Sequence, residues 1–419
     1  MPHVNAVDTT WVLFSAALVL FMTPGLALFY GGMVRAKNVL AVMMNNFIAM
    51  GIITLLWVLV AGSLAFGSDV GGGILGNLSL AGLSNLGHQL PGFHGIGASP
   101  MSVMVFQMMF AIITAALISG GTTDRIKFPA FVLLISLWMI LVYAPLAHWV
   151  FSPTGWLYHR GVLDFAGGTV VEINSGFSTL AVVLVLGRRR GWPGEAMAPH
   201  SVPLSLLGVG ILWFGWFGFN AGSSLGMNSV AVSAFVNTQI AAATGLLGWL
   251  VFERIKESYP TSLGAASGAV AGMVAITPCA GFVTPMASIF IGLAAGLICA
   301  VAVRLKFKWK YDDSLDVLGV HGVGGLTGMI LLGLFATKSV NPSGANGLFT
   351  GGGGHLLGVE VLAAVVCAFF AFGATWILAK VIDLTMGLRV SDEEEFTGLD
   401  LTQHAESAYS LGGMGRISS

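Results

Sequence analysis

The feature that most limits what this chain can fold into is a series of long apolar stretches, each about as long as a bilayer is thick. A hydrocarbon core about 30 Å thick needs roughly 20 apolar residues of helix. Eleven stretches near that length cover residues 10–30, 39–66, 101–121, 129–150, 169–187, 203–222, 230–252, 262–277, 285–303, 315–336 and 355–386. Because 56% of the residues are apolar and only 9% are charged, the chain cannot build a water-facing surface. We therefore predict an all-α polytopic membrane protein with eleven transmembrane helices.

Composition also excludes several classes of function. The formal net charge is −1 and no basic patch with interleaved aromatic residues occurs, so nucleic acid is excluded as a principal partner. The three cysteines, Cys279, Cys299 and Cys367, are scattered without a Cys-x-x-Cys or Cys/His cluster, so we predict neither a disulfide framework nor a metal site, and no cofactor.

Lys and Arg residues indicate the orientation, since they accumulate in cytoplasmic loops. If the N-terminus lies outside, 16 of the 18 Lys and Arg fall on inner segments, and only Arg160 and Lys338 fall outside. An odd number of spans then places residues 387–419 in the cytoplasm as a tail. We predict an N-out, C-in protein of the cell membrane.

Glycines recur at four-residue spacing inside several of the spans, where small residues let helix backbones approach closely. The clearest sets are Gly264, Gly268 and Gly272, then Gly292 and Gly296, then Gly324 and Gly328. We interpret them as packing seams of a compact bundle, which suits a narrow pore better than a large cavity.

Few ionisable residues fall inside the spans, where each costs a few kcal/mol on insertion scales. The clearest are Glu172 and His321, with Glu360 near the start of the last span. Asp164 precedes Glu172 and Asp316 precedes His321, each followed by Gly and Val, so the two segments echo each other. We expect Glu172 and His321 to face each other along a polar path. The alternative is that each is an isolated group satisfied by neighbouring backbone.

These two segments are the fifth and tenth of the eleven spans, as in two inverted repeats of five helices with one helix left over. The sequence thus predicts a transporter-type domain over residues 1–386, with repeats at about 10–187 and 203–336 and a final helix at about 355–386. Residues 387–419 form the tail.

Six glycine-rich strings, spread over nearly the whole chain, resemble the Amt/MEP/Rh family of ammonium transporters, most closely its bacterial Amt branch. They are Pro24-Gly-Leu-Ala-Leu-Phe-Tyr-Gly-Gly32, Asp164-Phe-Ala-Gly-Gly-Thr-Val-Val, Gly215-Trp-Phe-Gly-Phe-Asn-Ala-Gly-Ser223, Ala234-Phe-Val-Asn-Thr238, Gly319-Val-His-Gly-Val323 and Asp383-Leu-Thr-Met-Gly-Leu-Arg389. Any one string is weak, whereas six in the same order on matching spans are specific.

The resemblance implies a homotrimer with one pore per subunit, which carries ammonium or ammonia and accepts methylammonium as an analogue. By the same resemblance Phe106, Phe110 and Phe219 belong to an aromatic gate, and Ser223 hydrogen-bonds the incoming cation. It further implies that Asp164 supports this region by fixing local backbone, and that His321 is the second of two channel histidines. Independently of the name, aromatic faces attract a small cation by about 0.5–2 kcal/mol, which permits release.

The sequence departs from the family pattern at two positions. Glu172 replaces the usual first channel histidine, and a carboxylate there would titrate jointly with His321. Phe151 occupies the outer position where the family has tryptophan, and Trp149, two residues earlier, points about 200° away on a helix and is not expected to substitute. We expect Phe151 to hold a cation less well than indole would.

The tail carries the acidic run 392–395 and then a segment, Gly398 to Tyr409, that is similar to the family tail. A charge run alone is usually a solvated face. The similarity instead implies a regulatory segment that contacts the inner loops and offers a place for a PII-type signal protein.

Three hypotheses follow. The first is a transporter that takes up ammonium outside, relays its proton along Glu172 and His321, and delivers ammonia and proton inside. The second is an ammonium receptor that conducts little and signals through its tail. The third, an intramembrane hydrolase, lacks a His-Glu-x-x-His motif and a Cys/His nucleophile pairing, so we expect no enzyme activity.

Overall fold

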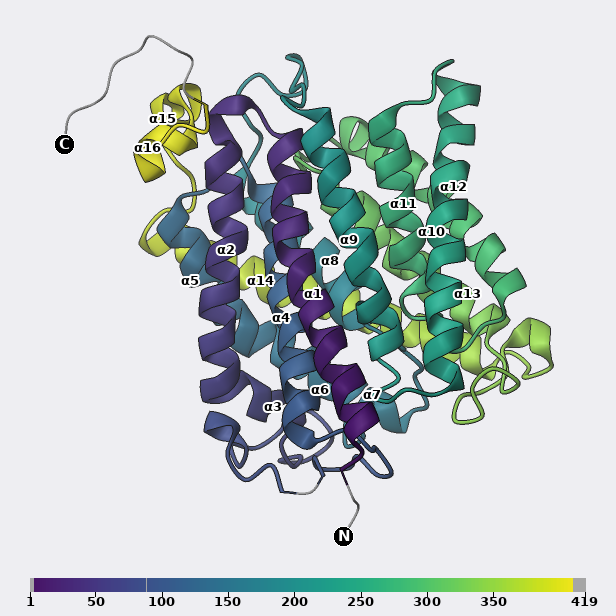
Figure 1. Ribbon diagram of the computed structural model, residues 1–419. Helices are drawn as coiled ribbons and strands as arrows, with labels where there is room; N and C mark the ends of the chain where they lie inside the picture. The colour runs from purple at the N-terminus through teal and green to yellow at the C-terminus, as the bar shows by residue number, and fades with distance from the viewer. Residues whose placement is uncertain (1–3, 88, 410–419) are drawn as a thin grey trace.

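The computed structural model describes residues 4–87 and 89–409, and the regular structure within them is helical (Figure 1). In chain order the helices are α1 Ala6–Met33, α2 Val39–Leu56, α3 Gly62–Phe66, α4 Pro100–Thr122, α5 Phe128–Trp138, α6 Ala144–Phe151, α7 Trp156–His159, α8 Asn174–Leu186, α9 Val202–Gly222, α10 Ser229–Lys256, α11 Ser262–Ile276, α12 Pro285–Trp309, α13 Val323–Phe335, α14 His355–Thr385, α15 Asp392–Thr397 and α16 Leu399–His404. The predicted all-α fold is confirmed.

Each predicted span coincides with a helical run. In the described part of the chain, ten runs are long and apolar enough to cross a membrane, and α11, with 15 residues, is shorter. At 1.5 Å per residue α11 spans about 22 Å, less than a bilayer core of about 30 Å. It ends at Ile276, and a short turn that includes Pro278 follows it. The count of eleven spans therefore stays a prediction.

Four of the runs contain a π-helical turn, a widened turn that often marks functional sites. Trp57–Ala61 joins α2 to α3, and Met139–Tyr143 joins α5 to α6. Gly168–Ile173 leads into α8, and Leu318–Gly322 leads into α13. The last two turns carry Glu172 and His321, so both ionisable residues singled out in the sequence lie on irregular backbone.

The predicted glycine seams pack α10, α11 and α12 together. A Cβ atom on Gly296 would overlap the carbonyl oxygen of Gly245, and one on Gly272 would overlap that of Ala241. Side chains at these positions would push the helices apart, since close approach depends on small residues.

The ends of the chain lie at opposite ends of the bundle. In Figure 1 the N-terminus lies at the lower end, whereas the tail helices α15 and α16 lie at the upper end. Opposite ends agree with an odd number of crossings. We call the end near the start of α1 the outer end and the tail end the inner end, after the predicted orientation.

Candidate pore and its two cavities

A cavity of about 350 Å³ opens at the outer end, and four of the predicted site residues line it. These are Phe110, Phe151, Asp164 and Ser223. They come from α4, from the end of α6, from the segment before α8, and from the end of α9. Residues far apart in the sequence thus meet at one place, which we call the outer cavity.

Two phenylalanine rings separate the outer cavity from the interior. The rings of Phe110 and Phe219 stack with centroids 4.1 Å apart and planes 14° from parallel. Phe110 lines the outer cavity, whereas Phe219 lines the narrow passage below it. The ring centroid of Phe106 lies 4.8 Å from that of Phe110, and Phe106 lines neither the outer cavity nor the passage. Phe106 therefore packs against the stacked pair without lining either space. The stacked rings therefore lie between the outer cavity and the passage.

Polar acceptors surround the outer cavity. The Ser223 hydroxyl donates to the Phe219 carbonyl at 2.8 Å, which leaves its oxygen lone pairs free to accept an N–H bond. Gln107, which the sequence analysis did not single out, also lines the cavity, and its Oε1 has no hydrogen-bond partner among the described residues. Its position between Phe106 and Phe110 in the motif was the signal that was available.

The aromatic residue of the outer cavity is Phe151, whose ring meets Phe110 edge-on at 6.5 Å. Trp149 points elsewhere, because its indole donates to the Ile74 carbonyl at 2.8 Å and packs on Phe370. Trp149 does not line the outer cavity. Its direction agrees with the expectation from helix geometry.

Asp164 holds the start of the π-helical turn Gly168–Ile173. Its Oδ1 accepts from the N–H groups of Gly167 at 2.8 Å and Gly168 at 2.7 Å. Its Oδ2 accepts from the Thr169 N–H at 2.8 Å and hydroxyl at 2.6 Å. Burial raises the pKa of Asp164, and these four donors act in the opposite direction. With its acceptor positions filled, Asp164 is suited to fixing backbone.

Glu360 of α14 contacts the segment that lines the outer cavity, because its carboxylate accepts from the Leu163 N–H at 2.8 Å. Glu360 is fully buried, so this carboxyl group does not line the cavity itself. It fastens the segment just before Asp164.

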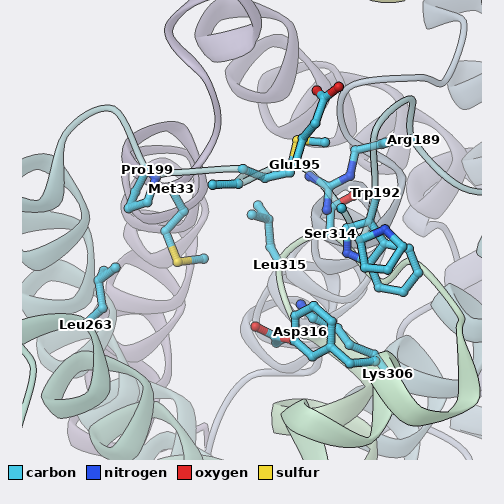
Figure 2. Close-up of a pocket in the computed structure, with 15 residues that line it drawn as sticks. Met33, Arg189, Trp192, Glu195, Pro199, Leu263, Lys306, Ser314, Leu315 and Asp316 are labelled. Atoms are coloured by element: carbon cyan, nitrogen blue, oxygen red, sulfur yellow. The ribbon is translucent and has the colours of Figure 1, made fainter. Parts of the chain in front are cut away.

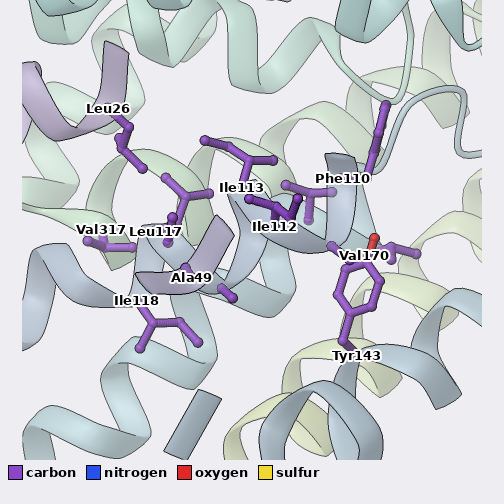
Figure 3. Packing of buried hydrophobic residues seen from close by; sticks show 14 of the residues in the cluster. Leu26, Ala49, Phe110, Ile112, Ile113, Leu117, Ile118, Tyr143, Val170 and Val317 are labelled. Atoms are coloured by element: carbon purple, nitrogen blue, oxygen red, sulfur yellow. The ribbon is translucent and has the colours of Figure 1, made fainter. Parts of the chain in front are cut away.

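Below the phenylalanine stack runs a narrow and mostly apolar passage, which we call the pore. Its volume is only about 10 Å³, which is about the least space that one water molecule needs. It is lined by Met22, Leu26, Phe29, Ile113, Leu117, Val171, Glu172, Leu212, Trp216, Phe219, Val270 and His321. Figure 3 shows how Leu26, Ile113, Leu117 and Phe110 follow one another within the buried cluster.

Two ionisable groups of the pore lining are in direct contact. Nδ1 of His321 lies 2.7 Å from Oε2 of Glu172, and both side chains are almost fully buried. Their two π-helical turns approach closely because glycines meet there: a Cβ on Gly176 would overlap the backbone of Gly322. An imidazole nitrogen and a carboxylate oxygen at this distance are within reach of a proton passed between them.

The structure corrects which aspartate before His321 corresponds to Asp164 before Glu172. The aspartate that begins the His321 turn is Asp313, eight residues before it, and not Asp316. Oδ2 of Asp313 accepts from the N–H five residues on, that of Leu318, at 2.7 Å, as Oδ2 of Asp164 does from Thr169. Asp316 instead forms an ion pair with Lys306 at 2.6 Å. The matching spacing of eight residues was visible in the sequence.

A second cavity, of about 490 Å³, lies at the inner end, and Figure 2 shows the residues that line it. Arg189, Lys306, Ser314 and Asp316 give it a polar wall, and Trp192 and Leu315 give it an apolar one. We call it the inner cavity. The described residues thus form a cavity at each end, and the narrow pore with the Glu172–His321 pair lies between the two ends.

The tail helices are attached to the inner loops. Oδ1 of Asp400 accepts from the Ala41 N–H at 2.8 Å, and Asn38 accepts from the Leu399 N–H at 2.8 Å. Glu395, within the acidic run, is buried and accepts from the Arg190 N–H at 2.7 Å. The run is therefore only partly a solvated face, and the tail contacts the inner loops as the similarity implied.

The segment Gly222–Gly226 reads Gly-x-Ser-x-Gly, a spacing found at hydrolase nucleophiles, and the sequence analysis overlooked it. The hydrolase motif needs a strand-to-helix turn. Here Ser224 follows the end of α9, and its hydroxyl bonds the carbonyls of Ala221 and Gly226. This serine therefore lacks the setting of a nucleophile.

The model of the Ammonium Transporter Family matches residues 10–409. An ammonium transporter of Bacillus subtilis is 49% identical over 96% of this chain and 98% of the relative. The crystal structure of Saccharomyces cerevisiae Mep2 superposes with a TM-score of 0.87 at 32% identity, covering 93% of this chain and 88% of that one. A structure described as a sensor Amt protein gives 0.87 at 30% identity, covering 95% and 98%.

Proposed function

Because this chain belongs to the ammonium transporter family, we propose that it moves ammonium inward as separate ammonia and proton, with the Glu172–His321 pair as the proton carrier. The observation that carries the proposal is this pair, 2.7 Å apart, in a pore of about 10 Å³. A hydrated cation does not fit such a space, whereas ammonia is small and neutral.

The first step is recruitment in the outer cavity. The rings of Phe110 and Phe151 attract a cation through their faces, and Ser223 and Gln107 offer oxygen acceptors for its N–H groups. Potassium has a similar size but donates no hydrogen bonds, so these acceptors favour ammonium. Asp164 acts indirectly by holding the backbone of this wall.

The second step is deprotonation at the phenylalanine stack. One N–H bond of ammonium breaks, its electron pair stays on nitrogen, and the proton passes to the Glu172–His321 pair. Ammonia then crosses the apolar lining, where a charged species would pay a large desolvation cost. In this scheme a carboxylate replaces one imidazole of the family relay.

Several further proposals concern the assembly. We place the protein in the cell membrane as a homotrimer with one pore per subunit, on the strength of the family resemblance. The docked tail supports a regulatory role at the inner face, where a PII-type signal protein would bind. Light scattering of the purified protein in detergent tests the trimer directly.

The experiment that tests transport uses proteoliposomes and two readouts. Solid-supported-membrane currents report charge, and uptake of labelled methylammonium reports the amine. We expect an ammonium-evoked current together with uptake, and little current with potassium. The alternative is a receptor that binds ammonium in the outer cavity but conducts little. The similarity to the structure described as a sensor Amt protein supports this alternative. Binding without uptake or current would favour the receptor.

A further inference from the structure

A buried histidine at the outer end is not used by the function described above. His148 lies near the end of α6, about one turn before Phe151, and its side chain is fully buried. It does not line the outer cavity. Buried polar groups without partners are rare, so each of its two ring nitrogens needs a partner.

Both ring nitrogens of His148 face acceptors. Nδ1 lies 2.9 Å from the carbonyl oxygen of Ala65 in α3. Because a carbonyl oxygen only accepts, Nδ1 must carry the hydrogen. Nε2 lies 3.4 Å from Oδ1 of Asp69, and neither of these two atoms has a hydrogen-bond partner among the described residues. A neutral ring would turn its lone pair toward the carboxylate, so this contact is favourable only when the two side chains hold one further proton.

The further proton belongs on the imidazole and not on Asp69. Burial acts to raise the pKa of Asp69, but the Gly73 N–H, the His148 ring and the Gly71 N–H together bring it below the ordinary value. The Ala65 carbonyl is among the last carbonyls of α3, and the C-terminus of a helix favours a cation. Asp69 is thus the carboxylate and His148 the imidazolium of an ion pair.

Asp69 belongs to a loop, residues 67–77, that folds back on itself. Within it the Val70 N–H donates to the Leu75 carbonyl at 2.9 Å. We call this loop the outer hairpin, and it follows α3, which lies with α6 and α7 at the lower, outer end in Figure 1. Three contacts attach it to the corner between α6 and α7. They are the Asp69–His148 pair, the bond from the Trp149 indole to the Ile74 carbonyl, and the bond from the Trp156 N–H to the Gly73 carbonyl at 3.1 Å.

Other titratable groups surround α6 without replacing Asp69. The outer hairpin has no titratable side chain besides Asp69, and α3 has none. On the other described elements that pack against α6, the titratable side chains are Tyr143, Tyr158, His159, Glu172 and, one turn from Phe370 on α14, Cys367. Tyr158 and His159 are exposed, and Glu172 contacts His321. Asp69 is therefore the acidic group that faces His148.

The corner between α6 and α7 forms part of the wall of the outer cavity. Phe151 ends α6, Tyr158 belongs to α7, and both line the cavity. The corner is tight, because a Cβ on Gly155 would overlap the carbonyl oxygens of His148 and Trp149. A shift of the backbone at His148 is therefore passed on to the aromatic residues of the wall.

We infer that Asp69 and His148 are a positioning pair, which holds the aromatic wall of the outer cavity in place only while His148 is an imidazolium. The inference rests on the proposed function, in which this cavity recruits ammonium. Imidazole is the side chain whose charge ordinarily changes between pH 5 and 8. When His148 releases its proton to water outside, the ion pair is lost and the outer hairpin loses one of its attachments to the corner. The affinity of the outer cavity for ammonium therefore falls as the outer pH rises.

The test measures apparent affinity from initial rates of labelled methylammonium uptake into proteoliposomes, at outer pH from about 6 to about 8.5 and constant internal pH. A primary alkylamine stays a cation over this range, so a change in affinity reports on the protein. Wild type should lose affinity by about fivefold, the low end of usual coupling between sites. Asp69→Asn should abolish this dependence, because its amide donates to a neutral Nε2. The same pH dependence in Asp69→Asn as in wild type would overturn the inference.

Two further variants keep the test decisive. His148→Gln removes the titrating ring and should show, at every pH, the weak affinity that wild type shows at the highest pH. Full wild-type affinity in His148→Gln at about pH 6 would also overturn the inference. The matched control is Asp8→Asn, since Asp8 also lies at the outer end but accepts from a backbone N–H, that of Met227, at 2.9 Å. Asp8→Asn should keep the wild-type pH dependence.

Amide hydrogen exchange tests the attachment without transport. At about pH 8.5 the peptides that cover residues 67–77 and 148–158 should exchange faster in wild type than in Asp69→Asn, whereas at about pH 6 the two proteins should be equally protected. Comparison at equal pH removes the intrinsic pH dependence of exchange. Equal exchange at both pH values would overturn the positioning pair, whatever the uptake shows. A wild type that takes up no methylammonium would overturn the proposed function instead.

Discussion

The turn that carries Glu172 and the turn that carries His321 are built alike, because an aspartate eight residues earlier holds the backbone of each. They differ in what surrounds that aspartate. Asp164, at the outer end, accepts from four donors, whereas Oδ1 of Asp313, at the inner end, has no partner among the described residues. Asp164 therefore uses all its acceptor positions to fix backbone at the outer end, whereas Asp313 at the inner end keeps Oδ1 free of the described residues. The two turns share one construction, and the donors around each aspartate decide what that aspartate can do.

The two ends of the pore also differ in closure. A stacked pair of rings closes the pore toward the outer cavity. The inner cavity has a larger volume than the outer cavity, about 490 Å³ against about 350 Å³, and part of its wall is polar. Under the proposed function, selection of the cation belongs to the outer end, and release belongs to the inner end.

The largest effect should come from removing the two aspartates. Asp164→Ala strands four buried donors and should lower the free energy of unfolding by about 3 kcal/mol or more. Asp313→Ala strands one backbone donor and should cost about 1–2 kcal/mol. Thermal unfolding of both variants in the same detergent measures the difference. Equal losses would mean that the two turns are held alike.

A smaller effect should follow from opening the stack at the outer end. Phe219→Ala should reduce ammonium transport by about tenfold, roughly 1.4 kcal/mol, or let potassium leak, while the protein stays assembled. The matched control is Phe217→Ala on the same helix, whose ring stacks 4.1 Å from Phe235 and lines neither the pore nor the outer cavity. If Phe219→Ala kept both rate and selectivity, the ring would not be a gate.

The smallest effect should come from changing the outer aromatic residue. Phe151→Trp should tighten apparent ammonium affinity by up to about 1 kcal/mol, because indole attracts cations more strongly than a phenyl ring. Selectivity over potassium should not change. Initial rates of uptake at varied ammonium concentration give the measurement. An unchanged apparent affinity would show that Phe151 does not face the cation.

Much of this arrangement could be predicted from the sequence, because membrane helices reveal themselves by length and apolar content. The ranges of the predicted spans agree with the helical runs, and α11, at 15 residues, is the shortest of them. The contact between Glu172 and His321 followed from the cost of burying either group alone. The all-α fold and the contact between Glu172 and His321 could therefore be predicted from the sequence.

Other features depended on local geometry that the sequence does not show. Asp312, Asp313 and Asp316 stand close together before His321. The eight-residue spacing favours Asp313, but the hydrogen bond from Leu318 that holds the turn is seen only in the structure. The buried contacts of Glu395 and Asp400 likewise depend on how the tail docks. Composition alone predicts solvated charges there.

The measurement that tests the central claim most directly is the ammonium-evoked current of Glu172 variants in proteoliposomes over about pH 5 to 8. If the Glu172–His321 pair carries the proton, Glu172→Gln should lose most of the current, because an amide does not accept a proton. Glu172→His should keep the current with a shifted pH profile, since imidazole restores a titrating partner. Wild-type current in Glu172→Gln across that whole range would contradict the account.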